Sequence, residues 1–375
     1  MRFRLLPRVA LPLDKLQLLK RLRERAAAGQ SSSQSASVAE TINQALRQAG
    51  LLPNDGAGAT MRTPSWMHES AETVPQQPTV DTDTDTASEG SQGEAANANG
   101  TFKAFTHQTQ WGRRRYWLFT PPAADEQPRP LLMMLHGCTQ APEDFALGTR
   151  MNDVARQHGV MVVYPMQTKS DNPNRCWNWF RTGDQKRNAG EPAELAALVR
   201  ELVGRGNVDP ERVYIAGMSA GAAMASILAR EFPQLFAAVG MHSGLVAGAA
   251  HDMVSALGAM QGRVPLMEAD ATSRSSMPLI TFHGDRDTTV VSANADSAVA
   301  AHAGSLQSTQ GGRDGREYTR RCYGTGATGC TIEQWTIHGA GHAWSGGDAR
   351  GSHTDAAGPD ASREMMRFFL SHSRR

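Results

Sequence analysis

The amino-acid sequence predicts an α/β fold in which a mainly parallel sheet is doubly wound with helices. Beyond residue 100, short segments with the pattern of strands alternate with segments that have the pattern of helices, as is typical of that class. The run Leu131–Leu135 is apolar on both faces, as expected for a parallel strand that is buried beneath helices on each side. The segment Val213–Glu231 has the pattern of a strand, a tight turn and an Ala-rich helix.

The predicted elements follow in order along the chain. Two antiparallel strands, 102–107 and 114–120, are joined through Trp111 and Gly112 and open the domain. Next come the strand 131–135, a helical stretch over 143–158, the strand 160–164, a long polar loop and a helix over 192–204. The second half contains the strand 213–216 with its helix 220–231, further strands at 278–284 and 332–338, and a last helix over 361–372.

Ser219 occupies the turn between strand 213–216 and helix 220–231, and Gly217 and Gly221 flank it. A strained turn of this kind leaves no room for side chains two residues before and after the serine. The turn also sets the hydroxyl at a helix N-terminus, where free N–H groups and the helix dipole favour developing negative charge. The pattern G-x-S-x-G alone is common by chance, but between a strand and a helix it predicts a nucleophile elbow.

A nucleophilic serine at such a turn needs an acid and a base that follow it in the order Ser, Asp or Glu, His. Asp285 and Asp287 come directly after the predicted strand that ends at Gly284. His342 follows strand 332–338, in a loop of small residues that would let an imidazole turn toward the serine. Of the two aspartates, Asp285 is close enough to the strand end to cap or turn the chain instead.

Five blocks of sequence resemble a known family. They are Leu135–Gln140 (LHGCTQ), Arg175–Phe180 (RCWNWF), Gly217–Gly221 (GMSAG), His283–Asp287 (HGDRD) and Gly341–Gly347 (GHAWSGG). Together, and in this order, they resemble the poly(3-hydroxybutyrate) depolymerase family of α/β-hydrolase esterases, over the chain from about residue 100 to its end. The resemblance implies an α/β-hydrolase fold, and its pattern H-G-x-x-D selects Asp287 as the acid.

The resemblance also implies a serine esterase that works through an acyl-enzyme. His342 would take the proton of Ser219, Asp287 would orient the imidazole, and the backbone N–H groups of Cys138 and Ala220 would hold the oxyanion. The implied substrate is 3-hydroxyalkanoate polyester or its oligomers. Feruloyl and acetylxylan esterases look similar and stay open as alternatives, as does a serine peptidase of the same fold. The mechanism requires no cofactor and no metal ion.

Two other interpretations of these residues are weaker. A catalytic Cys138 thiol is disfavoured because Ser219 has a complete set of partners elsewhere in the chain. A binding protein on an inactive hydrolase fold would be expected to lose Ser219, Asp287 or His342, and none of the three is missing.

The loop 174–180 concentrates aromatic residues in a segment that otherwise has the pattern of an exposed loop. Exposed aromatic rings usually mark a binding surface, and the resemblance places this loop beside the active site. Trp177 and Trp179 are therefore expected to contact the substrate, unless they pack under the loop as its own core. Trp344, two residues after the predicted catalytic histidine, is a further candidate for the substrate pocket.

The four cysteines allow three pairings. Cys322 and Cys330 are close enough in the chain to bridge the base of a hairpin. Cys138 with Cys176 could connect the loop 174–180, here called the tryptophan loop, to the loop 136–139, here called the oxyanion loop. Disulfides imply export. A zinc site is disfavoured, because no C-x-x-C spacing is present.

Two regions before residue 101 have no counterpart in the resemblance. Residues 1–52 form a basic segment with helical patterns, and residues 13–50 could contact a partner or an anionic surface. Residues 53–100 are rich in Thr, Asp, Gln, Glu and Gly and predict a disordered linker, because their apolar content is too small to offset the entropy of ordering them. The catalytic domain is therefore predicted over 101–375.

Charge and hydropathy exclude several classes of function. A formal net charge of +1 gives no reason to expect nucleic-acid binding, and no apolar stretch is long enough to span a membrane. Pro7, Arg8 and Pro12 interrupt the only apolar run near the N-terminus, and no small-residue cleavage site follows. A signal peptide of the usual form is not predicted, which favours the cytoplasm, although the resembled family includes secreted members.

Overall fold

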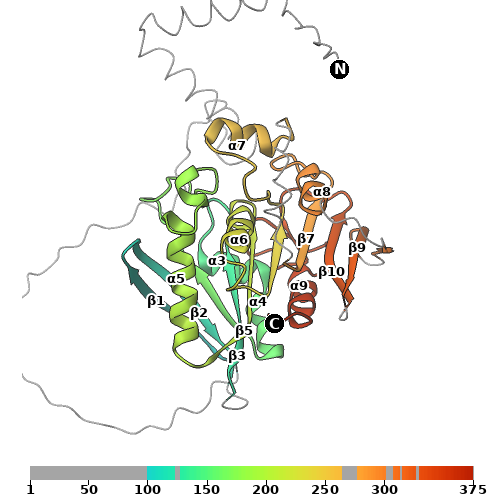
Figure 1. Cartoon of the computed structure of the whole chain (residues 1–375). Helices are drawn as coiled ribbons and strands as arrows, with labels where there is room; N and C mark the ends of the chain where they lie inside the picture. Colours follow the sequence, from blue (N-terminus) through green and yellow to red (C-terminus); the bar gives the residue numbers. More distant parts are fainter. Residues whose placement is uncertain are drawn as a thin grey trace, which may run out of the picture. The chain divides into compact units, whose positions relative to one another are not determined.

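The computed structural model describes residues 99–122, 127–263, 277–300, 307–312, 315–326 and 329–374. The predictions for residues 1–52, and those for 53–98, lie outside these ranges. Within the described residues the α/β-hydrolase fold is confirmed: one large sheet lies between two layers of helices (Figure 1).

The sheet has a parallel centre and antiparallel margins. Its strands lie in the order β1-β2-β4-β3-β5-β6-β7-β10-β9-β8. Their bounds are β1 (Thr101–Thr109), β2 (Gly112–Thr120), β3 (Arg129–Leu135), β4 (Met161–Pro165), β5 (Val208–Met218), β6 (Ala238–His242), β7 (Leu279–Gly284), β8 (Gln307–Gly311), β9 (Tyr318–Gly326) and β10 (Gly329–Ile337). The strands from β4 to β10 in this order run parallel. At one margin β1 and β2 join antiparallel, and at the other β9 and β8 do.

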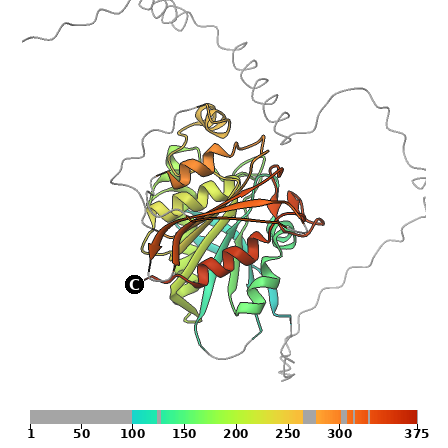
Figure 2. The same cartoon turned by 90° about the vertical axis from the view of Figure 1, so that its right-hand side faces the viewer.

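Alternate residues of the central strands face different helix layers. Leu131, Met133 and Leu135 pack in one apolar core, and Leu132 and Met134 pack in the other, all of them fully buried. The first core contains α5 (Gly190–Gly204), α6 (Ala220–Glu231), α7 (Met253–Met260) and part of α8 (Ala293–Val299); the second contains α3 (Pro142–Thr149), α4 (Met151–His158) and α9 (Ala361–Leu370). The view in Figure 2 shows α9, in red, on the opposite side of the sheet from the yellow α6.

The helix expected over 143–158 is wrong as a single element, because the chain breaks it into α3 and α4 at Arg150. Arg150 has a left-handed backbone (φ 54°, ψ 22°) and its N–H donates to Leu147 O, so α3 ends there. The break frees the carbonyl of Thr149, which accepts a hydrogen bond of 2.6 Å from Ser362 Oγ on α9. A hydrogen bond from α9 thus stabilises a helix break that the local sequence does not predict.

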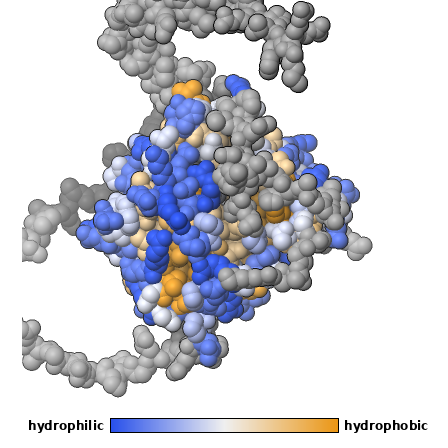
Figure 3. All heavy atoms as spheres, viewed as in Figure 1, coloured by the Kyte–Doolittle hydropathy of each residue, from blue (hydrophilic) through white to orange (hydrophobic). Residues whose placement is uncertain are grey.

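Three short elements complete the described fold. They are the 3-10 helix η1 (Thr182–Gln185) and the two-residue strands β11 (Trp344–Ser345) and β12 (Thr354–Asp355), which pair with each other. The face seen in Figure 3 is mostly hydrophilic over α5, with a hydrophobic spot over the start of α7, where Met253 and Val254 are exposed. None of the described helices is long and apolar enough to cross a membrane.

Candidate active site

Ser219 lies on a sharp turn between β5 and α6. Its backbone adopts φ 55° and ψ −120°, a conformation that costs strain for a residue with a side chain. Its N–H donates to His242 O at 2.9 Å, which ties the turn to the end of the neighbouring strand β6. The turn carries Ser219 at the N-terminus of α6, as the sequence predicts.

The two flanking glycines are required by close backbone contacts. A Cβ at Gly217 would lie 2.4 Å from the carbonyl carbon of Gly221. A Cβ at Gly221 would lie 2.0 Å from the carbonyl oxygen of Leu135, at the end of β3. The first of these contacts is inside the turn, whereas the second presses the turn against the strand that leads to the predicted oxyanion loop.

Asp287 and His342 are brought together by the fold. His342 Nδ1 lies 2.7 Å from Asp287 Oδ2. The other carboxylate oxygen, Oδ1, accepts the backbone N–H groups of Thr289 and Val290, both at 2.9 Å. The side chain of Asp287 is fully buried, while that of His342 is 12% exposed. The arrangement fixes the imidazole through Nδ1 and leaves Nε2 as the nitrogen that can exchange a proton.

The pKa of Asp287 lies well below its usual range. Burial raises it, but hydrogen bonds from His283 and His342, together with the charge of the His342 imidazole, outweigh burial. Asp287 is therefore ionised near neutral pH, which is the state that can stabilise an imidazolium.

Asp285 has a different partner. Its carboxylate contacts His338 Nδ1 at 2.9 Å and accepts the N–H of Gly339 at 2.7 Å, so it fastens the chain just after β10. Both groups of this pair are well exposed, with 40% of the His338 side chain and 37% of the Asp285 side chain accessible. Asp285 thus behaves as the turn-forming residue that the sequence suggested, and Asp287 is the one that contacts His342.

Ser219, Asp287 and His342 follow the C-terminal ends of three parallel strands, β5, β7 and β10, so they lie along one edge of the sheet. In the described part of the chain no hydrogen bond joins Ser219 Oγ to His342. Contacts of this kind are often long in unliganded enzymes and tighten when substrate binds.

His242, which was not among the predicted site residues, connects the turn that carries Ser219 to the loop that carries His342. Its carbonyl accepts the N–H of Ser219, and its Nε2 accepts the N–H of Ser345 at 3.0 Å. Its ring stacks on Trp344, with the ring centroids 5.0 Å apart. Burial, together with the nearby imidazoles of His283 and His342, lowers the pKa of His242 to about 3, so it is neutral. No strand was predicted at 238–242, so the sequence patterns gave no signal for this residue.

The loop that contains Cys138, one of the two predicted oxyanion donors, passes beside Ser219. A Cβ built on Gly137 would lie 3.6 Å from Ser219 Cβ, so the loop after β3 passes directly beside the elbow. Cys138 follows in this loop, and Ala220 begins α6. Among the described residues, neither the Cys138 N–H nor the Ala220 N–H donates a hydrogen bond to the protein. Two backbone donors are thus available beside the hydroxyl.

The cysteines form the two predicted pairs. Cys138 is bonded to Cys176, and Cys322 is bonded to Cys330 across the β9–β10 hairpin. The first bond connects the predicted oxyanion loop to the tryptophan loop. Because Cys138 is in a disulfide, it carries no thiol that could act as a nucleophile.

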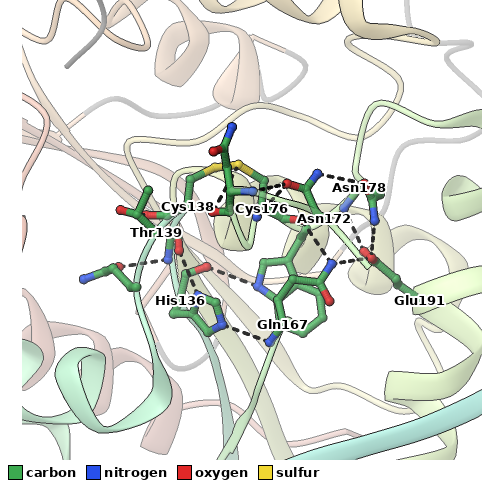
Figure 4. Close-up of a disulfide and its surroundings, with 12 residues drawn as sticks. His136, Cys138, Thr139, Gln167, Asn172, Cys176, Asn178 and Glu191 are labelled. Atoms are coloured by element: carbon green, nitrogen blue, oxygen red, sulfur yellow. Dashed lines mark hydrogen bonds between the residues drawn. A yellow bond between two sulfur atoms is a disulfide. The ribbon is translucent and has the colours of Figure 1, made fainter. Parts of the chain in front are cut away.

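The expectation that the loop 174–180 exposes its tryptophans is wrong. Trp177 is fully buried and Trp179 is 6% exposed. Trp177 Nε1 donates to His136 O at 3.1 Å, and the guanidinium of Arg114 lies 5.2 Å from the centre of its ring. The polar loop can be buried because its polar groups bond to one another and to Glu191 on α5 (Figure 4).

Trp344 is buried as well, with 1% of its surface accessible. Its Nε1 donates to Ser362 Oγ on α9, and its ring meets Phe145 on α3 edge-on. It packs beneath the surface as a support for the loop that carries His342, and its ring is not exposed to a ligand.

Comparison with known proteins points to the esterases of one family. The family described as esterase, PHB depolymerase matches residues 114–319, which is more than half of the chain. The chain belongs to this family. Poly(3-hydroxyalkanoate) depolymerase C of Paucimonas lemoignei is 30% identical over 231 residues, which are 57% of this chain and 54% of that protein. The PHB depolymerase family member described here thus spans about half the length of that relative.

Other relatives carry different names. Feruloyl esterase B of Neurospora crassa is 28% identical over 153 residues, which are 40% of this chain and 51% of that protein. Among solved structures, an acetyl xylan esterase from Aspergillus awamori superposes with a TM-score of 0.58 and 18% identity. The superposition covers 72% of this family member and 100% of the acetyl xylan esterase chain. The last likeness bears on the fold alone.

Proposed function

We propose that the chain is a serine esterase that hydrolyses 3-hydroxyalkanoate polyester or its oligomers through an acyl-enzyme. The observation that carries this proposal is the strained Ser219 turn beside two unpaired backbone N–H groups, on the same sheet edge as the Asp287–His342 pair. Strained backbone conformations of this kind cluster at functional sites.

In the first step Ser219 Oγ attacks the ester carbonyl carbon while His342 Nε2 takes the hydroxyl proton. The carbonyl oxygen becomes an oxyanion and accepts hydrogen bonds from the N–H groups of Cys138 and Ala220. His342 then gives the proton to the leaving alcohol oxygen, the C–O bond of the ester breaks, and the acyl group stays on Ser219. Asp287 holds the imidazole in one tautomer throughout.

In the second step water takes the place of the serine hydroxyl. His342 removes a proton from the water, whose oxygen attacks the acyl carbon, and the same two N–H groups hold the new oxyanion. Return of the proton to Ser219 Oγ releases the carboxylic acid and restores the free enzyme. A backbone oxyanion hole suits an ester carbonyl, because each N–H points to where charge develops.

The substrate class rests on family membership. Polyester depolymerases, feruloyl esterases and acetylxylan esterases are all among its relatives. Incubation of the protein with hydroxybutyrate trimer, a feruloyl ester and acetylated xylan, followed by product analysis, separates the three. We expect 3-hydroxybutyrate and its dimer as products; release of ferulate or acetate alone would reassign the substrate. A peptide anilide tests for peptidase activity in the same assay.

The role of Ser219 is tested by Ser219→Ala. Alanine fits the space of the serine side chain but lacks the nucleophilic hydroxyl. Hydrolysis of p-nitrophenyl butyrate should therefore fall to background, and the melting temperature should stay that of the wild type. A folded variant that keeps its activity would remove Ser219 from the mechanism.

A further inference from the structure

A buried polar network lies directly behind the proposed oxyanion loop (Figure 4). Its centre is the carboxylate of Glu191, in the first turn of α5, which is 6% exposed. Three donors converge on it: Gln167 Nε2, Asn178 Nδ2 and the backbone N–H of Asn178. A carboxylate is an acceptor only, so the ionised form satisfies all three donors.

The network reaches the oxyanion loop through Gln167. The backbone N–H of Gln167 donates to His136 Nε2 at 3.1 Å, so the other ring nitrogen, Nδ1, carries the proton and donates to Gly137 O at 2.8 Å. The Gly137 carbonyl and the Cys138 N–H belong to the same planar peptide group and point in opposite directions. Fixing the direction of the carbonyl therefore fixes the direction of the proposed oxyanion donor.

A second connection runs through the tryptophan loop. Asn178 Oδ1 accepts from Asn172 Nδ2 at 3.0 Å, and Asn172 Oδ1 accepts the backbone N–H of Cys176 at 3.4 Å. The disulfide joins Cys176 to Cys138. The carboxylate of Glu191 is thus connected to Cys138 in two ways. One route runs by hydrogen bonds through Gln167 and His136 to the Gly137 carbonyl, and the other runs through the tryptophan loop to Cys176 and its disulfide.

We propose that Glu191 is a positioning residue for the oxyanion hole: its ionised carboxylate orders Gln167 and Asn178, which in turn aim the Cys138 N–H at the position of the oxyanion. This inference rests on the proposed function of Ser219 and Cys138. Protonation of Glu191 adds an O–H where three donors already converge and makes the oxygen that carries the proton a weaker acceptor, so the three hydrogen bonds are weakened. The loop is then held less firmly, and transition-state stabilisation falls.

The charges around Glu191 allow it to change state near neutral pH. Burial raises the pKa of Glu191, Arg114 on β2 lowers it, Asp184 on η1 raises it, and the hydrogen bonds from Asn178 and Gln167 lower it, so that the pKa is about 7. Arg114 also bonds to Glu194 on α5 at 2.6 Å, which reduces its effect on Glu191. His136 stays neutral over this range, because burial lowers its pKa to about 4. Glu191 and the base His342 therefore both have to be deprotonated in the fully active enzyme.

The test is Glu191→Gln in the full chain, with p-nitrophenyl butyrate as substrate and kcat and KM measured from pH 5 to pH 9. Glutamine imitates the protonated carboxyl, because its NH2 group places N–H donors opposite the donors of Gln167 and Asn178. Loss of a whole oxyanion donor costs about a hundredfold to a thousandfold in kcat, so a donor that is only misaimed should cost about tenfold. We expect that loss above pH 7, with KM changed by less than about threefold and the two profiles converging in acid.

The acid limb of the profile supplies the second readout. The ratio of the wild-type kcat/KM to that of Glu191→Gln should rise from about one in acid to about ten above pH 7, because only the wild type gains an ionised carboxylate at this position over that range. A matched control is Glu333→Gln, a buried carboxylate on β10 that pairs with Arg320 and Arg367. It should lower the melting temperature and keep both the wild-type kcat and the wild-type dependence of kcat/KM on pH.

The outcomes separate this inference from the proposed function. If Ser219→Ala is inactive but Glu191→Gln has the kcat and pH dependence of the wild type, the positioning role is wrong and the esterase proposal stands. A wild-type profile of log(kcat/KM) that a single ionisation describes contradicts the inference without any variant, even if Glu191→Gln does not fold. If Ser219→Ala stays active, both proposals fail together.

Discussion

At the scale of single residues, the two neighbouring aspartates have separate tasks. Asp287 contacts His342 at 2.7 Å from a buried position, whereas Asp285 contacts His338 on the surface. We expect Asp287→Asn to lower kcat on p-nitrophenyl butyrate by up to about ten thousandfold, because an amide there favours the wrong imidazole tautomer. Asp285→Asn serves as the matched control and should lower kcat by less than about threefold. A larger loss in Asp285→Asn than in Asp287→Asn would reverse the assignment.

The raised pKa of Glu191 also predicts how stability depends on pH. Burial raises the pKa from 4.5 to about 7, so the folded state favours the neutral acid. The stability that this group contributes is full below pH 4.5 and is lost as pH rises through about 7. Between these values the free energy of unfolding of the wild type should fall, relative to Glu191→Gln, by on the order of 3 kcal/mol. Urea unfolding of both proteins at several pH values measures it; a constant difference would contradict the raised pKa.

At the scale of elements, the elbow depends on contact between α6 and the end of β3. A methyl group at Gly221 would lie 2.0 Å from Leu135 O, a backbone atom that cannot move without displacing the oxyanion loop. Gly221→Ala should therefore lower the melting temperature and abolish ester hydrolysis together. Gly204→Ala, at the end of α5 with open space around it, is the control and should leave both unchanged or slightly raise stability. An active and stable Gly221→Ala would show that the turn adapts.

The tryptophan loop is a structural support, and that changes what its variants should do. Trp177 is fully buried and bonded to His136 O, so Trp177→Ala leaves a cavity and an unpaired carbonyl. We expect a loss of about 3–5 kcal/mol in stability and equal fractional losses of kcat/KM on p-nitrophenyl acetate and on hydroxybutyrate trimer. Trp111→Ala, which removes an exposed ring, is the control and should change neither. A loss confined to the trimer would instead place Trp177 in the substrate pocket.

At the scale of the whole molecule, the described fold begins with β1 at Thr101 and contains every residue of the proposed site. The predicted boundary between linker and catalytic domain at residues 100 and 101 leads to a direct test. A shortened chain that starts at Asn99 should fold and hydrolyse p-nitrophenyl butyrate at close to the rate of the full chain. Melting temperature and kcat of the two proteins are compared side by side. An insoluble or inactive short chain would mean that residues before 99 are needed by the hydrolase.

The sequence by itself determined the α/β class, the strands β1 to β5, β7 and β10, and the serine turn. The central strands are apolar on both faces because helices cover both sides, and that pattern is local. Gly217, Ser219 and Gly221 identify the elbow, since only glycine fits the close backbone contacts found there. Asp287 and His342 were predicted from the chain order Ser, Asp, His and from the family pattern H-G-x-x-D, which selects Asp287 over Asp285.

Only the tertiary structure decided which groups are buried and what satisfies them. The loop 174–180 has the composition of an exposed loop, yet Asn178 and its neighbours are buried because Glu191, on a helix that starts later in the chain, accepts their hydrogen bonds. A helix ends at Arg150, and the carbonyl of Thr149 that the break leaves free accepts a hydrogen bond from Ser362, more than two hundred residues away. Burial of polar groups depends on partners brought together by folding, and such partners leave no periodic signal in the sequence.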